Sequence, residues 1–304
     1  MTRYLIARLL QGIVTVLILT TFVFFAARLT GSPLDVITPD SATPEQRAQI
    51  AHQLGLDRST WEQFWIYVSG LFRGDLGQSY ILHRSVASLY WHALPNSMEL
   101  ILPAFVVAIA VGVPLGVLSA TAKSRAARAA IGLYSGSGMA APTFWVGLLL
   151  ISVFSVALRL LPSAQMGGPD HFILPVITLS FAISAGIIRM VRSAMIETLP
   201  SEYITFARIK GVSEPTIVWK HALRNALNAT VAFLSVSLAA LITGSLVVEI
   251  VFAWPGLGRL TYQAISSRDY PLAQGIMLMS GVLIVVLNLL FDIAQTRLDP
   301  RSRL

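Results

Sequence analysis

The chain has 304 residues, of which 55 % are hydrophobic and only 12 % are charged, against roughly 25 % charged residues in ordinary soluble domains. Its formal net charge is +7 and it contains no cysteine, which excludes a disulfide framework, a cysteine–zinc cluster and thiol catalysis. This composition leaves no room for large soluble domains. It therefore predicts an all-α, polytopic membrane protein.

An uncharged run from Leu9 to Ala27 follows Arg3 and Arg8 at the N-terminus. The run is longer than the roughly 7–15-residue apolar core of a signal peptide and fits a helix that crosses a bilayer. We therefore expect a retained first transmembrane helix, with the N-terminus in the cytoplasm.

Residues 28–99 form the only long hydrophilic connection. Its apolar residues Trp61, Phe64, Trp65 and Val68 have helical spacing, which predicts an amphipathic helix that lies on the bilayer or packs on the rest of the protein. The sequence GDLGQS within this connection is not a phosphate loop, because it lacks the GK[ST] ending and a preceding strand.

Five further apolar runs complete a prediction of six spans. The pairs Gly112-xxx-Gly116 and Gly132-xxx-Gly136 predict close approach of neighbouring helices. The third run is uncharged for longer than a bilayer requires, so we expect it to tilt or to include an interfacial stretch. The five expected spans are residues 100–122, 129–158, 171–190, 226–248 and 270–291.

The distribution of charge gives an orientation. With six spans and the N-terminus inside, the cytoplasmic segments hold 14 of the 22 basic residues but only five of the 15 acidic ones. Positive charge concentrates on the cytoplasmic side of inner-membrane proteins. The count therefore predicts that the polar segment 202–225 is cytoplasmic.

Segment 202–225 has the local signals of two short helices around a turn. Ser201 and Ser213 are candidate N-caps, and Glu202 places negative charge at the first helix start. Arg208 lies near the end of that helix, and Gly211 suits the left-handed residue after it. The helical spacing of Tyr203, Phe206, Ala207 and Lys210 predicts a narrow apolar stripe that ends in a basic residue. From the residues alone, an amphipathic helix pair on the membrane surface is favoured. A DNA-binding helix-turn-helix is disfavoured, because the charges are mixed and membrane-length runs flank the segment.

Several motifs resemble one family. The sequences FARIKG (206–211) and KHALRN (220–225) resemble the cytoplasmic coupling segment of ABC-importer permeases, and are most similar to the first (B-type) permease of the dipeptide/oligopeptide/nickel branch. Thr205 and Phe206 depart from the general EAA pattern, and Asn228 stands where a proline is common. Further motifs typical of this branch are LGLDR (54–58), RGDLGQS (73–79), VVEIVFAWPGLGRL (247–260), RDYP (268–271) and LDPR (298–301).

The resemblance implies a type I ABC importer-like permease in the bacterial cytoplasmic (inner) membrane, with both termini inside. Its partners would be a second, similar permease, two ATP-binding subunits or domains, and an extracytoplasmic solute-binding protein. It also implies an extracytoplasmic region at 31–98, between a first helix within 1–30 and a permease core at 99–304. The ATPase-coupling segment 201–225 would act through Glu202, Tyr203, Phe206, Ala207, Arg208, Lys210, Gly211, His221, Arg224 and Asn225.

Several kinds of chemistry are not expected. The sequence has no Walker A motif, so we expect ATP to be hydrolysed by partner subunits and this chain not to be an enzyme. The five histidines form no HExxH motif and no close ligand pair, so neither a metal site nor a cofactor is expected. The spans are almost free of ionisable residues, which argues against a proton-coupled carrier. A secondary carrier or channel stays an alternative that the composition allows but segment 202–225 does not favour.

Glu249 is the one acidic residue embedded in an apolar stretch, and a Pro-Gly-x-Gly turn follows it. An interfacial anchor is the favoured interpretation, and a role facing the translocation path is the alternative. We therefore take Glu249, Trp254, Pro255 and Gly256 as candidates for the path or an outer gate. For the substrate, the resemblance favours di- and oligopeptides, with nickel, a metal chelate, glutathione or an opine as alternatives.

Overall fold

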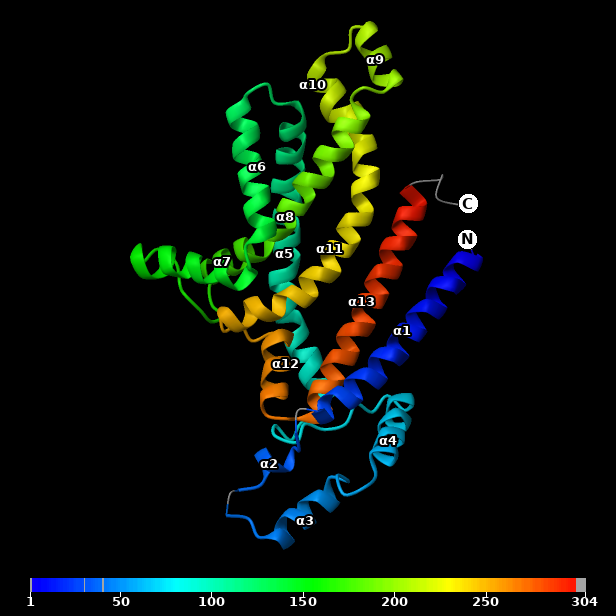
Figure 1. Ribbon diagram of the computed structural model, residues 1–304, viewed down its shortest axis with the longest axis vertical. Helices are drawn as coiled ribbons and strands as arrows, with labels where there is room; N and C mark the ends of the chain where they lie inside the picture. The colour runs from blue at the N-terminus through cyan, green and yellow to red at the C-terminus, as the bar shows by residue number, and fades with distance from the viewer. Residues whose placement is uncertain (1, 30, 40, 299–304) are drawn as a thin grey trace. The chain divides into compact units, whose positions relative to one another are not determined.

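The computed structural model describes residues 2–29, 31–39 and 41–298, and in these ranges the regular structure is helical apart from an isolated bridge between Gln78 and Ser85. The all-α prediction is therefore confirmed. The helices (Figure 1) are α1 Thr2–Leu29, α2 Leu34–Ile37, α3 Pro44–Gln53, α4 Thr60–Phe72, α5 Val86–Thr121, α6 Arg125–Ala140, α7 Thr143–Leu150, the π-helix η1 Ile151–Ala157, α8 Asp170–Thr198, α9 Glu202–Ile209, α10 Glu214–Thr216, the π-helix η2 Ile217–Ala222, α11 Leu223–Val251, α12 Leu257–Ser266 and α13 Tyr270–Leu298.

Five described helices are long and apolar enough to cross a membrane, and the bent pair Arg125–Ala140 with Thr143–Ala157 makes a sixth if it counts as one span. The third expected span is not one continuous helix, because the chain turns by 113° between its two halves. Its expected tilt or interfacial stretch stays a prediction. Pro142 lies at the break. Proline cannot donate the helical hydrogen bond and disfavours helical geometry in the residue before it.

Helix α5 begins at Val86, well before the span expected from Leu100. It runs for 36 residues, which at 1.5 Å per residue is about 54 Å and exceeds the roughly 30 Å hydrocarbon thickness of a bilayer. The expected start of the permease core at residue 99 thus lies inside one continuous helix. The C-terminal tail 299–304, with most of the LDPR motif, lies outside the described residues.

The chain divides into two compact units. Unit 1 holds Met1–Asn96 and Pro255–Val285, and unit 2 holds Ser97–Trp254 and Val286–Leu304. In unit 1, α1 packs closely on α13, where a Cβ added at Gly281 would meet the Leu19 side chain.

The amphipathic helix α4 packs on α1 through aromatic side chains. Its Phe64 ring lies 5.1 Å from Phe24 and 5.7 Å from Phe25, measured between ring centroids. The N-cap Ser59 and Glu62 form a reciprocal capping box that starts the helix. Of the two interpretations of this helix, the structure therefore supports packing on the rest of the chain.

In unit 2, α5 and α8 approach so closely that Gly112 and Gly116 have no room for a side chain. A Cβ added at Gly112 would lie 2.7 Å from Ile187, and one at Gly116 would lie 2.7 Å from Val191. The first small-residue motif is therefore confirmed. The second motif makes no close contact within this chain, since a Cβ added at either Gly132 or Gly136 would meet nothing within 4 Å.

A neighbouring residue on α6 makes the close contact that was expected of the second motif. A Cβ added at Gly138 would lie 2.7 Å from the Cβ of Ala185 on α8. Residues that are three or four positions apart lie on one helical face, so a motif of spaced glycines fixes a face but not the helix that it meets.

Candidate coupling segment and outer motifs

The coupling segment is held to unit 2 by Ile204, whose side chain is fully buried. Ile204 belongs to a hydrophobic cluster with Ile217 and Ala222 of η2 and with Met195 of α8. Burying an isoleucine side chain stabilises a protein by about 1.5–3 kcal/mol. Ile204 was not expected to be buried. It lies about 100° around the helix from Tyr203 and therefore outside the expected stripe.

The turn after α9 has the geometry that the sequence predicted. Gly211 has φ +76°, the left-handed region in which glycine carries no steric cost. The amide of Gly211 donates to the carbonyl of Arg208 over 2.9 Å, and the amide of Val212 donates to that of Ala207 over 3.1 Å. A Cβ added at Gly211 would meet nothing within 4 Å, so its conformation and not crowding selects glycine here.

The expected side-chain caps are wrong, although both serines occupy the N-cap positions. The Ser201 hydroxyl donates back to the carbonyl of Thr198 over 2.6 Å, and the Ser213 hydroxyl pairs with that of Thr216 over 2.9 Å. Neither hydroxyl reaches the free amides of the helix that follows.

Two side-chain contacts tie the segment together instead. Arg208 Nε donates to Glu214 Oε1 over 2.7 Å across the turn. Asn225 Nδ2 donates to the Tyr203 hydroxyl over 2.6 Å, which links α9 to the first turn of α11. Both pairs are exposed, so each adds at most about 1 kcal/mol to stability but fixes the orientation of α9.

The second expected short helix does not end before the fifth span. The helical structure from Glu214 runs through α10, η2 and α11 to Val251 without a break. The sequence after Pro215 holds neither glycine nor proline until Gly244, so nothing interrupts it. A π-helix of six residues, Ile217–Ala222, joins α10 to α11.

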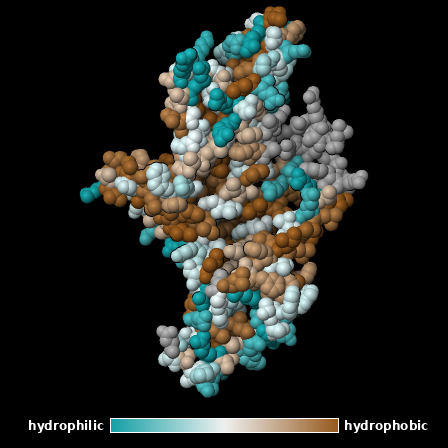
Figure 2. Space-filling model, in the orientation of Figure 1, coloured by the Kyte–Doolittle hydropathy of each residue, from teal (hydrophilic) through white to brown (hydrophobic). Residues whose placement is uncertain are grey.

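The outward face of α9 is apolar. Tyr203 is 43 %, Phe206 57 % and Ile209 78 % exposed, and the Lys210 ammonium lies 4.5 Å from the centroid of the Phe206 ring. Figure 2 shows hydrophilic side chains gathered with hydrophobic ones at this end of unit 2.

The rest of the segment sorts into exposed and half-buried side chains. Ala207 is half-buried and packs against the cluster around Ile204, so it belongs to the base of the segment more than to its outward face. Sequence analysis included Ala207 in the stripe and missed Ile209. The remaining coupling candidates are exposed residues: Glu202, Arg208, Lys210, Gly211, His221, Arg224 and Asn225.

Glu249 and Trp254 are both fully buried within unit 2. The Ser97 hydroxyl donates to Glu249 Oε1 over 2.7 Å, and the Trp254 ring packs edge-on against Phe172 with centroids 4.7 Å apart. The Glu249 carboxylate therefore acts in packing α5 against α11 in this conformation. Both expectations for Glu249, an interfacial anchor and a residue that faces the path, stay predictions.

The Pro-Gly-x-Gly turn begins unit 1's C-terminal part. Ala253 before it has φ +47°, a left-handed conformation in a non-glycine residue. Pro255 is exposed and its carbonyl accepts from Asn96 Nδ2 over 2.8 Å, whereas Gly256 is buried at the N-cap of α12. The path or gate role of these residues stays a prediction.

Two sequence motifs that lie 190 residues apart meet at Asp269, which sequence analysis did not foresee. The carboxylate of Asp269 accepts from the Ser79 hydroxyl over 2.5 Å and from the backbone amides of Tyr80 and Ile81 over 3.2 Å. It also accepts from the amide of Leu272 over 3.3 Å. The buried carboxylate thus fastens the GDLGQS loop to the junction of α12 and α13.

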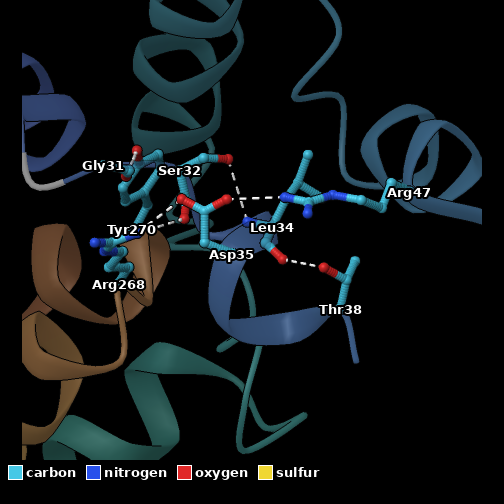
Figure 3. Close-up of polar contacts among 8 residues, drawn as sticks. All are labelled: Gly31, Ser32, Leu34, Asp35, Thr38, Arg47, Arg268 and Tyr270. Carbon is cyan, nitrogen blue, oxygen red and sulfur yellow. Dashed lines mark hydrogen bonds and ion pairs between the residues drawn. The ribbon is translucent and has the colours of Figure 1, made fainter. Parts of the chain in front are cut away.

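The neighbouring Arg268 makes a second fastening in unit 1 (Figure 3). Its guanidinium donates to Asp35 Oδ2 over 2.8 Å, and Arg47 donates to Asp35 Oδ1 over 2.8 Å. The Tyr270 hydroxyl donates to the carbonyl of Gly31 over 2.5 Å. Three consecutive residues of the RDYP motif therefore contact three separate sites in the N-terminal region. Arg268 contacts Asp35, Asp269 contacts Ser79 and Tyr270 contacts Gly31.

The chain matches two family descriptions that together cover most of its length. Residues 112–304 match the binding-protein-dependent transport system inner membrane component, and residues 1–100 match the N-terminal part of the same kind of membrane component. The chain belongs to this family. The resemblance drawn from its motifs is therefore confirmed.

Curated relatives agree over the full length. The chain is 36 % identical over 304 residues to the glutathione transport system permease protein GsiC of Escherichia coli O6:H1 (strain CFT073), covering 100 % of this chain and 99 % of the relative. The protein of that name from Shigella dysenteriae serotype 1 (strain Sd197) has the same identity and coverage.

Solved structures share the fold. Against an inward-facing MetNI methionine ABC transporter the TM-score is 0.61 at 18 % identity, covering 69 % of this chain and 96 % of the other. Against an amino acid ABC transporter with histidines the TM-score is 0.56 at 17 % identity, covering 69 % and 94 %. The fold is that of type I ABC importer permeases, as expected.

Family membership establishes the general role. The chain is a multi-pass permease of the bacterial inner membrane and works in an ATP-driven importer with a second permease, ATPase subunits and a solute-binding protein. ATP hydrolysis belongs to the partner subunits, and this chain is not an enzyme. A stand-alone secondary carrier or channel is thereby excluded.

Proposed function

We propose that residues 201–225 dock on the ATPase subunit and that the transporter carries small peptides, including glutathione, into the cell. The observation that carries the docking proposal is the exposed row of Tyr203, Phe206 and Ile209 on a helix whose other face is anchored by buried Ile204. An apolar face on a short helix is the recognition element of helix-in-groove interfaces. In this proposal Phe206 is the central anchor.

The docking proposal is tested by Phe206→Ala in the complete transporter. We expect ATP-dependent uptake to fall at least tenfold and the ATPase subunit to dissociate during purification, because a buried aromatic anchor typically contributes more than 2 kcal/mol to an interface. Phe72→Ala removes an even more exposed phenylalanine, 84 % exposed, in unit 1 and serves as the matched control. Normal uptake and ATPase retention in the Phe206 variant would exclude this docking surface.

Phe206 is a sharper probe than Ala207. Ala207 packs against the buried cluster at the base of α9, so an aspartate there would disturb the segment itself as well as any partner contact. Phe206 is exposed in the chain alone, and its loss should leave the permease folded.

The orientation of the chain belongs to the same proposal, with residues 31–85 outside and 201–225 inside. Cysteines introduced at exposed Ala48 and Ser213 into this cysteine-free chain should react with an impermeant reagent from opposite sides of the membrane. Ala48 is preferable to Ser59, whose hydroxyl caps α4. Reaction of both cysteines from one side contradicts the proposal.

The substrate proposal rests on the family branch and on the GsiC relatives, whose name assigns them to glutathione transport. Cells that lack other peptide importers should take up labelled dialanine and labelled glutathione when they produce the whole system. Excess of either unlabelled peptide should inhibit both. Uptake of radioactive nickel without uptake of either peptide would favour the metal branch of the family instead.

A further inference from the structure

Unit 1 contains an apolar cavity of about 680 Å³, whose wall comes from α1, α4, the loop after α4, α5 and α13. Among the described residues that line it, none is ionisable. The hydroxyls of Thr20 and Thr21, which belong to the wall, donate to the carbonyls of Val16 and Leu17 over 2.7 and 2.9 Å. These threonines therefore offer no free donor to an occupant. The wall suits hydrocarbon better than a peptide or an ion.

The cavity extends through one half of the membrane depth. On α1 it reaches Leu17, near the middle of the uncharged run 9–27, and on α13 it reaches Val282, at the middle of the candidate span Tyr270–Ile293. Its other end lies at α4, which packs on the end of α1. The hydrocarbon core of a bilayer is about 30 Å thick, so a single lipid leaflet fills about 15 Å of it. The cavity therefore has the depth of one leaflet.

The size of the cavity argues against a transmembrane helix of a partner subunit as its occupant. A helix with its side chains is about 10 Å wide, so a length of about 15 Å takes up roughly 1,200 Å³. This is nearly twice the volume of the cavity. A spanning helix would also need a groove through both leaflets. An acyl chain of a lipid satisfies both limits, because it is slender and belongs to one leaflet.

Aromatic and basic side chains lie where a lipid head group would be. Trp65 of α4 and Trp91 of α5 line the cavity and are exposed, and tryptophan is enriched at the depth of the head groups. Arg73 is exposed and immediately precedes Gly74, another residue of the wall. Its guanidinium donates to the carbonyl and hydroxyl of Ser69 over 3.3 Å, which leaves further N–H donors. Its charge complements the phosphate that every phospholipid carries.

We propose that this cavity binds a phospholipid of the leaflet next to α4, with one acyl chain along α1 and α13 and the phosphate at Arg73. In the orientation proposed above this is the outer leaflet, but the site itself does not depend on that orientation. It depends neither on the docking of the ATPase subunit nor on the transported substrate.

The test uses the complete transporter, reconstituted in phosphatidylcholine with a trace of phosphatidylcholine that carries a photoreactive diazirine in the middle of one acyl chain. The complex is extracted into detergent, washed free of loosely held lipid and illuminated, and mass spectrometry identifies the crosslinked residues. We expect crosslinks at Thr20 and Thr21 of α1 and at Leu278 and Met279 of α13. We expect few at Ile18, which is exposed but lies outside the cavity.

Leu17→Trp and Ile18→Trp form a matched pair on α1. Both side chains are exposed, so both variants should fold, but of the two residues only Leu17 lines the cavity. We expect Leu17→Trp to reduce the crosslink at Met279 at least tenfold, because the indole ring takes the space of the acyl chain. Ile18→Trp should change it less than twofold. An undiminished crosslink in Leu17→Trp, or no crosslink to the cavity in the wild type, overturns the proposal.

Benzoylphenylalanine, a photoreactive residue, introduced at Thr21 gives an independent readout of the occupant. We expect it to capture phosphatidylcholine, because Thr21 lines the cavity and is exposed. Capture of the second permease instead would assign the cavity to that subunit and overturn the proposal.

A further arm tests the phosphate. A diacylglycerol with the same diazirine-labelled chain lacks the phosphate, and we expect it to give at least threefold fewer crosslinks. Arg73→Gln should lower the crosslinking of phosphatidylcholine to the level of the diacylglycerol. Arg58→Gln, at an exposed arginine that does not line this cavity, should leave it unchanged. Equal crosslinking of the two lipids in the wild type overturns the proposed role of Arg73.

Discussion

In unit 1, the carboxylates of Asp269 and Asp35 are each held by several groups of the same chain. On α9 in unit 2, by contrast, Phe206 and Ile209 are left exposed and a single buried side chain, Ile204, fixes the helix to its base. The first arrangement fixes the conformation around these two carboxylates, because each accepts hydrogen bonds from several groups of the same chain. The second leaves an exposed apolar surface, which is the surface that we propose to dock on the ATPase subunit.

This difference predicts different effects of substitutions in the two regions. Changes at the fastening of unit 1 should lower the stability of the chain itself. Changes on the outward face of α9 should leave the chain folded and weaken only its assembly. The four predictions below are ordered by the expected change in the free energy of unfolding.

Asp269→Ala should be the most destabilising change, by about 3–5 kcal/mol, because it leaves the Ser79 hydroxyl and three backbone amides without their acceptor in a buried site. Thermal unfolding of the purified permease in detergent measures the effect. Asp170→Ala, at an exposed carboxylate, should change the midpoint little. Equal unfolding midpoints for the two variants would show that the hydrogen bonds of Asp269 do not stabilise the fold.

Ile204→Ala should destabilise the coupling segment by about 2–4 kcal/mol, because it opens a cavity in the cluster with Ile217 and Met195. Limited proteolysis should cleave residues 201–213 faster than in the wild type. Ile209→Ala, an equal truncation at an exposed position of the same helix, is the control. Faster cleavage in the Ile209 variant would reverse the assignment of the two faces.

Alkaline pH should loosen unit 1 through Tyr67 and Tyr80. Their folded pKa of about 12 exceeds the ordinary value of 10, so their stabilisation is complete below pH 10 and is lost as the pH rises towards 12. Each contributes about 2–3 kcal/mol over that window. The pH dependence of unfolding should flatten in Tyr67→Phe/Tyr80→Phe. Tyrosinate absorbance that develops fully near pH 10 in the folded protein would contradict the expectation.

Gly211→Val should cost the least, about 1–2 kcal/mol, because only the positive φ and no neighbouring atom opposes a side chain there. The variant should fold yet lower uptake, since the following helix starts in a changed direction. Gly211→Asn, whose side chain tolerates the left-handed region, should transport close to normally. If the valine variant also transports normally, the turn does not set the direction of the helix that begins at Glu214.

Much of the fold followed from local signals. The apolar runs predicted the spans, the helical spacing around Trp61 predicted α4, and Gly211 predicted the left-handed turn. These features depend on a few neighbouring residues, so a sequence reveals them. The serine caps failed because a hydroxyl can bond backwards as well as forwards, and only the packed structure decides between the two.

The meeting of Ser79 with Asp269 could not be predicted in this way. Both residues lie in motifs that the sequence marked as typical of the family, yet no periodicity relates positions 190 residues apart. The same holds for Ile204, whose burial depends on η2 and α8. The coupling residues themselves stay a prediction, because their role lies in contacts with another subunit.

The unbroken helical course from Glu214 to Val251 connects the proposed coupling segment directly to the region of Glu249. Its three parts of three, six and 29 residues make a rod of about 57 Å at 1.5 Å per residue. A tilt of about 5° at the cytoplasmic end would displace the far end by about 5 Å if the rod stayed rigid. Glu249 lies near that far end. If an ATPase subunit docks on residues 201–225 as proposed, a movement imposed near Lys220 would shift the Ser97 contact by about 5 Å. Within this helical course, the π-helix η2 is the part that departs from α-helical geometry, and it contains Lys220.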